Sequence, residues 1–206
     1  MMLTTDRWES TWNKLDLVCP DPRLFDSVIE HYSQPHRHYH TVQHLEECFA
    51  KWEELRAQSR HPGEVELALW FHDIIYDVRR HDNEEKSAEW AHRCLQGAGA
   101  SEEVAQRVHA LIMATRRHET GDDVDATILV DVDLSIFAAP PDRFQEYERQ
   151  IRAEYGYVPQ PLFTQERSKI LRRFLNRPRI FNTAAFFERY EAKARSNLED
   201  ALQSSQ

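Results

Sequence analysis

Eleven histidines are present in the 206-residue chain, and two of them have a spacing that suits metal binding. His40 and His44 are four residues apart, so in a helix both side chains would project from one face toward one site. A histidine pair of this kind is a weak signal by itself, because many such side chains are simply exposed to solvent. A metal site at this pair needs further ligands from elsewhere in the chain.

The dipeptide His72-Asp73 lies inside the most apolar stretch of the sequence, residues 64–77. A helix that is apolar on all sides is buried, and a buried carboxylate beside a buried imidazole is costly unless it is paired or bound to a cation. Three arrangements would satisfy these groups: a His–Asp pair in the core, a bond from an arginine to Asp73, or a divalent ion bound by both side chains.

Two further aspartates, Asp131 and Asp133, lie in an apolar run, and one of them is a candidate for an additional oxygen ligand. Apolar residues alternate with polar ones over residues 127–137, which is the periodicity of a half-buried strand. The pattern alone therefore predicts a strand for this segment.

The cysteines suggest no site of their own. Cys48 follows His44 by one helical turn and is a conceivable thiolate ligand, but no second cysteine stands near it in the sequence. We therefore interpret Cys48 as a small core residue. Cys19, Cys48 and Cys94 are far apart and odd in number, which argues against a disulfide framework and favours a cytoplasmic location.

Other charged residues follow the His-Asp pair or end a helix. Asp77 could act as a general base or an outer hydrogen-bond acceptor, although a solvated charged face is an equally good interpretation of the acidic residues behind it. Arg117 and His118 follow a predicted helix, where cations are favoured by the helix dipole. Stabilisation of the helix end and binding of a phosphate group are equally good interpretations of these two residues.

A histidine pair, then a buried His-Asp, then a distant aspartate resembles the ordered signature of the HD superfamily of metal-dependent phosphohydrolases. Residues 39–44, YHTVQH, are similar to the YHNxxH segment of the cyclic-nucleotide phosphodiesterases, and residues 133–135, DLS, to the segment around their last metal ligand. From about Tyr32 to Leu198 the chain looks closer still to a bacterial group of predicted metal-dependent HD phosphohydrolases. The motifs FHDIIYD, ATRRH and ERSKILRRFLNRPRIF carry this resemblance.

The resemblance implies an all-helical fold with the site between the central helices, and helix rather than strand for residues 127–137. It assigns the metal-ligand role to four side chains: His44, His72, Asp73 and Asp133. It prefers Asp133 to Asp131 and gives His40 the role of general acid. Thr41 replaces the phosphodiesterase asparagine, and the C-terminal third lacks their purine pocket, so the resemblance does not imply specificity for cyclic nucleotides.

The expected reaction is hydrolysis of a small phosphorylated substrate, a phosphomonoester or a nucleotide-like molecule. A divalent ion would polarise a phosphoryl oxygen and lower the pKa of a bound water, Asp73 or Asp77 would take a proton, and His40 would protonate the leaving group. The candidate substrate-binding residues are Arg37, Arg117, His118, Arg167 and Lys169. Arg167 is favoured because its segment belongs to the resemblance. The ligand types suit Mn, Fe, Co, Ni, Zn or Mg.

Two other functions remain open. The first is a catalytically silent metal-binding sensor or scaffold of the HD type. The second is metal-dependent chemistry of another kind, such as oxygen activation at a di-iron site, for which His118 and Glu84 are the obvious extra ligands.

Composition limits the partners. The formal net charge of −9 would repel a nucleic-acid backbone, so we expect no nucleic-acid partner. No apolar run approaches the ~20 residues of a membrane span, and the N-terminus lacks the apolar core of a signal peptide. The oligomeric state cannot be read from the sequence.

The elements that must position these residues are predicted to be helices of a single all-α domain, an HD-type bundle. Its metal-site core would span about residues 32–140, followed by C-terminal helices within residues 141–203. The expected helices include Asp21–Ile29, Tyr39–Leu55, Asn83–Leu95, one capped by Ser101, Asp142–Tyr155, Phe163–Leu175 and Thr183–Leu202.

Overall fold

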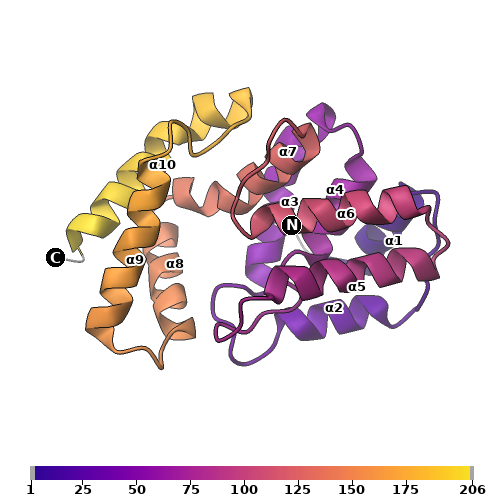
Figure 1. The fold of residues 1–206 in the computed structure, drawn as a ribbon, viewed down its shortest axis with the longest axis horizontal. Coiled ribbons are helices and arrows are strands. Elements are labelled where there is room, and N and C mark those ends of the chain that lie inside the picture. The colour runs from indigo at the N-terminus through magenta and orange to yellow at the C-terminus, as the bar shows by residue number, and fades with distance from the viewer. Residues whose placement is uncertain (1–2, 205–206) are drawn as a thin grey trace. The chain divides into compact units, whose positions relative to one another are not determined.

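A computed structural model describes residues 3–204, and all regular structure within that range is helical, which confirms the all-α prediction (Figure 1). The helices are α1 (Thr5–Asn13), α2 (Leu24–Tyr32), α3 (Val42–Leu55), η1 (Arg56–Gln58), α4 (Pro62–Phe71), α5 (Asn83–Gly97), α6 (Glu102–Thr115), α7 (Val124–Asp133), η2 (Leu134–Ala138), α8 (Pro141–Glu154), α9 (Gln160–Leu175) and α10 (Ala184–Ser204). None of the helices within residues 3–204 combines the length and apolar character that a membrane span needs.

The chain divides into two compact units, and the boundary falls between Val132 and Asp133, near the end of α7. The first unit contains α1 to α6 and nearly all of α7. The second begins with the last residue of α7 and contains η2 and the three C-terminal helices. The single domain with a metal-site core over about residues 32–140 stays a prediction.

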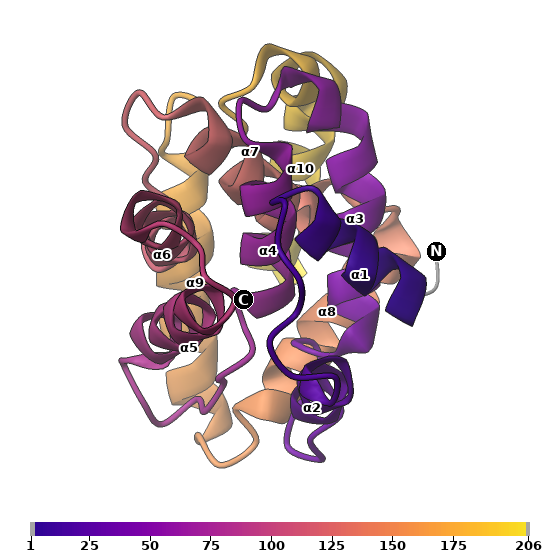
Figure 2. The same ribbon diagram turned by 90° about the vertical axis from the view of Figure 1, so that its right-hand side faces the viewer.

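Helix α4 is the centre of the first unit. Every residue from Gly63 to Phe71 is buried, so the helix has no face that can meet water. It therefore needs neighbours on all sides, and it packs against α1, α3, α5 and α6 (Figure 2). This confirms the expectation that the apolar stretch before His72 is buried.

A fully buried carboxylate, Glu66, joins α4 to its neighbours. Its Oε1 accepts hydrogen bonds from Lys14 Nζ at 2.6 Å and from Trp52 Nε1 at 2.9 Å, and its Oε2 lies 3.1 Å from Thr11 Oγ1. These four residues, Thr11, Lys14, Trp52 and Glu66, form what we call the Glu66 cluster. Each oxygen of the carboxylate meets a hydrogen-bond donor, which compensates for the loss of water on burial.

Residues 127–137 are helical, so the strand predicted from their periodicity is wrong and the resemblance gave the right answer. Alternation of apolar and polar residues indicates a strand only if the polar residues face solvent. Here Ile128, Leu129, Val130, Asp131 and Val132 are all fully buried. The acidic side chains therefore do not mark a solvent-exposed face.

In the second unit, α10 packs against η2 and α9, and α8 packs against η2. Asn197 of α10 donates hydrogen bonds to the carbonyl oxygens of Phe137 and Ala139, which fixes the end of η2. Glu191 of α10 accepts hydrogen bonds from the backbone N–H groups of Ile180 and Phe181, which precede that helix in the chain. The three C-terminal helices lie where the sequence predicted them, within a few residues.

Helix boundaries in the first unit differ from the predictions in informative ways. Ser101 caps α6 as expected, with its hydroxyl accepting the backbone N–H of Val104. Helix α2 starts at Leu24, after a turn in which Asp21 accepts the N–H of Arg23. Helix α3 starts at Val42 and not at Tyr39, because Thr41 is extended.

Candidate metal centre

Helix α3 carries two candidate ligands on one face. His44 and Cys48 are one turn apart, and both are almost fully buried. The sulfur of Cys48 lies 3.7 Å from Nδ1 and 3.7 Å from Nε2 of His44. The helix therefore presents an imidazole and a thiol to the same point.

The His-Asp pair follows directly after the last residue of α4. His72 is the C-cap, and its Nδ1 lies 2.8 Å from the carbonyl oxygen of Leu69. Because a carbonyl can only accept, Nδ1 carries a proton, and Nε2 is the ring nitrogen that faces the other candidate ligands. This Nε2 lies 3.1 Å from Nε2 of His44.

Asp73 adds a carboxylate oxygen to the two imidazoles. Its Oδ2 lies 3.2 Å from Nε2 of His72 and 3.5 Å from Nε2 of His44. Burial acts to raise the pKa of Asp73, but the charge of His72, hydrogen bonds to both rings and the charge of His40 together hold this pKa well below its usual range. The carboxylate is therefore ionised beside the two rings.

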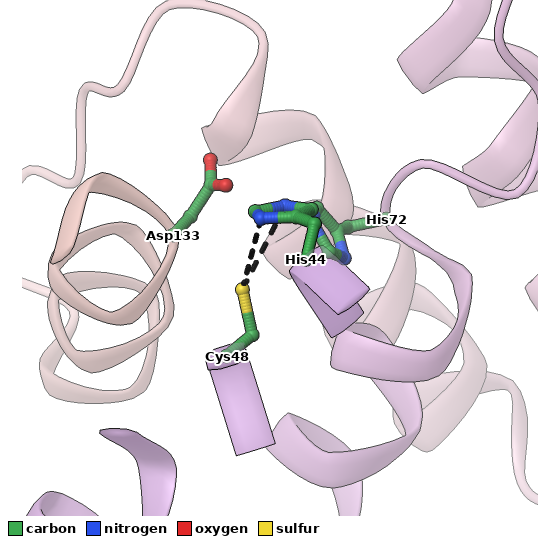
Figure 3. A group of neighbouring side chains, drawn as sticks. All are labelled: His44, Cys48, His72 and Asp133. Atoms are coloured by element: carbon green, nitrogen blue, oxygen red, sulfur yellow. Dashed lines mark hydrogen bonds between the residues drawn. The ribbon is translucent and has the colours of Figure 1, made fainter. Parts of the chain in front are cut away.

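Asp133 completes the group. It is the last residue of α7, so the helix that ends the first unit holds its backbone. One donor atom from each of His44, Cys48, His72 and Asp133 can be chosen so that all four lie within 4.8 Å of one another. Figure 3 shows the Asp133 carboxylate directed toward the two imidazole rings. We refer to these four residues and Asp73 as the candidate ligand group.

The distances suit a shared metal ion. In a tetrahedral zinc site with ordinary bond lengths, two nitrogen ligands lie about 3.3 Å apart, and a nitrogen and a sulfur ligand about 3.6 Å apart. The corresponding separations here are 3.1 Å between the Nε2 atoms of His44 and His72, and 3.7 Å between Nε2 and the sulfur of Cys48. These two separations are compatible with a shared divalent cation.

Arg37, predicted to bind substrate, reaches both backbone turns that flank the candidate ligand group. Its buried guanidinium donates hydrogen bonds to the carbonyl oxygens of His40 at 3.1 Å, Asp73 at 2.6 Å and Ile74 at 2.8 Å. These bonds tie the turn before α3 to the turn after α4. They give Arg37 a positioning role, and substrate binding by this residue stays a prediction.

Two further side chains fix the turn after α4. The hydroxyl of Tyr32 accepts the backbone N–H of Asp73, and the hydroxyl of Ser87 accepts that of Ile75. Burial raises the pKa of Tyr32 to about 12, so it stays a neutral phenol. The backbone around Asp73 is thus held from α2, α5 and Arg37.

His40 lies in the turn before α3 and not inside the helix, so the prediction that it shares a helical face with His44 is wrong. Its ring stacks on Tyr76 with a centroid distance of 4.0 Å, and the centroids of the His40 and His44 rings are 5.8 Å apart. His40 therefore stands beside the candidate ligand group, half-buried, and does not belong to it.

The remaining predicted site residues have varied surroundings. Asp77 is exposed, and its carboxylate accepts the backbone N–H of Arg79. Arg117 is exposed just after α6, and His118 follows it with a positive φ of 53°. Lys169 is exposed on α9 and forms an ion pair with Glu166 of the same helix. Their functional roles stay predictions.

Arg167 is buried in the second unit and is engaged by side chains of α8. It donates to the hydroxyl of Tyr147 at 2.8 Å and forms an ion pair with Glu148. Burial acts to lower the pKa of Arg167, but Tyr147 and Glu148 keep this pKa above its usual value. Burial, together with the charges of Glu148 and Asp133, raises the pKa of Tyr147, although Arg167 opposes the shift. The predicted phosphate anchor is thus paired within the protein.

Cys48 is a member of this group that the sequence analysis noted as a conceivable thiolate ligand but interpreted as a core residue. Its spacing of four residues after His44 was the available signal. Comparison with models of known protein families, with curated proteins and with solved structures gives no match for this chain. The description of the site therefore rests on its geometry alone. The protein is all-helical, and it contains a group of His, Cys and Asp side chains that can hold a metal ion.

Proposed function

We propose that this protein is a metal-dependent phosphohydrolase of the HD type, which hydrolyses a phosphomonoester or a nucleotide-like small molecule. The observation that carries the proposal is the convergence of two imidazole nitrogens, 3.1 Å apart, with the carboxylates of Asp73 and Asp133. These residues come from three separated segments, in the order that resembles the HD signature. A divalent ion held by these residues would supply Lewis-acid chemistry, polarising a phosphoryl oxygen and lowering the pKa of water.

The protein's own groups prepare the site for that chemistry. The hydrogen bond from Nδ1 of His72 to Leu69 directs Nε2 toward the candidate ligand group, and the carboxylate of Asp73 lies beside both rings. Arg37 holds the carbonyl oxygens of His40 and Asp73 at fixed places. We assign the proton-accepting role to Asp73 in preference to Asp77, whose exposed carboxylate caps a turn.

His40 is proposed as the general acid. Its ring is close enough to His44 to serve the same reaction centre, and stacking on Tyr76 fixes its orientation. An imidazole exchanges protons readily near neutral pH, so it is suited to protonate a leaving alkoxide.

The test is a screen of the metal-stripped protein against phosphomonoesters and nucleotides, with Mn²⁺, Fe²⁺, Co²⁺, Ni²⁺, Zn²⁺ or Mg²⁺ added back. The proposal expects at least one substrate to be hydrolysed with at least one metal, and no hydrolysis by His72→Ala under the same conditions. Hydrolysis that persists in His72→Ala would indicate a contaminating enzyme. Metal binding with no hydrolysis of any substrate would replace the proposal with a silent sensor or scaffold.

A further inference from the structure

Cys48 lies in surroundings that differ from those of an ordinary core cysteine. A buried cysteine usually behaves as a small apolar residue among other apolar residues. The sulfur of Cys48 instead lies 3.7 Å from both ring nitrogens of His44 and within 4.8 Å of donor atoms of His72 and Asp133. Figure 3 shows the thiol rising from α3 toward the ring of His44.

The convergence of the other donors is a second observation, independent of the cysteine. His44 and His72 are 2% and 1% exposed, and their Nε2 atoms are 3.1 Å apart. Because Nδ1 of His72 donates to the carbonyl oxygen of Leu69, Nε2 is the nitrogen through which this ring can bind an ion. Side-chain atoms that can bind a metal ion thus come together from α3, α7 and the end of α4, and the sulfur is one of them.

We propose that Cys48 is a ligand of this metal site and that its thiolate makes the site select Zn²⁺ over Mn²⁺ and Mg²⁺. The inference rests on the metal site of the proposed function and goes beyond it, because that function is compatible with any of several divalent ions. On binding, the S–H bond of Cys48 breaks, its proton passes to solvent, and a sulfur–metal bond forms with no change of oxidation state.

The chemistry of the donor set gives the selectivity. Thiolate is a soft ligand that favours Zn²⁺, whereas Mg²⁺ and Mn²⁺ prefer oxygen ligands. His44, His72, Cys48 and Asp133 offer two nitrogens, one sulfur and one oxygen. One carboxylate oxygen of Asp73, Oδ2, lies 3.2 Å from Nε2 of His72 and 3.5 Å from Nε2 of His44. The sulfur shifts the preference toward Zn²⁺ whether or not Asp73 also binds.

The spectrum of the Co²⁺-loaded protein tests whether sulfur binds the ion. Co²⁺ occupies zinc sites and absorbs in the visible, and a bound thiolate adds a strong sulfur-to-cobalt charge-transfer band in the near ultraviolet. The metal-stripped full-length wild type is titrated with Co²⁺ alone, and both absorptions are expected. Cys94→Ala is the matched control, because Cys94 is a partly buried thiol on α5 outside the candidate ligand group, and it should keep the near-ultraviolet band.

The outcomes separate this inference from the proposed function. Visible cobalt bands without the near-ultraviolet band in wild type would overturn the role of Cys48 and leave the metal site intact. The absence of both absorptions at saturating Co²⁺ would overturn the metal site itself. Because wild type decides the question, a folding defect in a variant does not affect the result.

Affinities test the selectivity. Cys48→Ala should weaken Zn²⁺ binding by about 100-fold, because one of four ligands is lost. Mn²⁺ binding should change by less than about threefold, because manganese gains little from sulfur. Competition titrations measure both, and circular dichroism checks that the variant is helical. Equal losses for the two ions would overturn the selectivity.

Discussion

Two buried polar clusters lie in contact with α4, and their chemistry differs. In the Glu66 cluster, a carboxylate is surrounded by hydrogen-bond donors from Lys14, Trp52 and Thr11. In the candidate ligand group, two imidazole nitrogens, two carboxylates and a thiol lie close to one another. In the first cluster, hydrogen-bond donors match a single acceptor, whereas the second brings together several side chains that can each bind a metal ion. A cation satisfies several electron-pair donors at once, so the second cluster is the one suited to a metal ion.

The comparison also explains why burial alone does not identify a site. Glu66 is fully buried, and so is Asp131, yet neither belongs to the group that can hold a metal. What distinguishes the candidate ligands is that several side chains able to bind a metal ion, two imidazoles among them, come together.

The largest effect is expected for His72→Ala, which removes one of the two converging imidazoles. Retention of metal should fall by at least about 10³-fold, because a lost nitrogen ligand also leaves His44 and Asp73 without their shared partner. Elemental analysis after gel filtration measures the metal, and circular dichroism should still show a helical protein. Full metal occupancy in this variant would refute the ligand role of His72.

Glu66→Ala should lower the stability of the fold and leave metal binding unchanged, which is the reverse of the effect expected for His72→Ala. Its loss leaves the indole N–H of Trp52 buried next to a cavity, so the free energy of unfolding should fall by roughly 3 kcal/mol. For a chain of this size the melting temperature should drop by about 6 to 12 °C. The variant should still bind metal as wild type does. A normal melting temperature would show that the Glu66 cluster does not stabilise the fold.

His40→Ala should leave metal content unchanged and reduce turnover by roughly 10²–10⁴-fold, if His40 is the general acid. The loss should be smaller for a nitrophenyl ester, whose leaving group needs no proton. Kinetics with good and poor leaving groups provide the check. Equal losses for both would remove His40 from this role, and loss of metal would make it a ligand.

The smallest effect concerns Asp125, another buried carboxylate that is surrounded by donors in the first unit. Burial acts to raise its pKa, but hydrogen bonds from Ser59, Arg60 and His61 lower it below the usual value. A lowered folded-state pKa stabilises the protein above the unfolded-state pKa, and this contribution is lost as the pH falls through the folded-state value.

Asp125→Asn should therefore cost about 1–2 kcal/mol near neutral pH, with no change in metal binding. The difference in unfolding free energy between wild type and variant should shrink between about pH 5 and about pH 3. Denaturant titrations at the two pH values give this difference. A difference that grows on acidification would contradict the assigned cause.

Much of the fold follows from local patterns. The Ser101 cap and the three C-terminal helices were predictable because hydrophobic spacing and capping residues lie close together in the sequence. The strand predicted for residues 127–137 failed because alternation indicates two faces only when one of them is exposed, and both sides of α7 are buried. Exposure depends on tertiary packing, which the local sequence does not contain.

The candidate site could be predicted only in part for the same reason. The resemblance named His44, His72 and Asp133, and these three are brought together. Cys48 was considered as a ligand but interpreted as a core residue, because sequence alone does not tell which face of α3 meets α4. The hydrogen bonds from Arg37 to carbonyl oxygens could not be predicted from the sequence either, since Asp73 and Ile74 are 36 and 37 residues away along the chain.

The most direct measurement is anomalous diffraction from a crystal of the protein with Zn²⁺ added, recorded at the zinc absorption edge. The account predicts one strong peak bonded to Nε2 of His44 and Nε2 of His72 at about 2.0–2.1 Å, with a carboxylate oxygen of Asp133, and not of Asp131, also bound. Crystals that bind no zinc between these two imidazoles, or bind it only at surface histidines, would contradict the metal site and the function proposed from it.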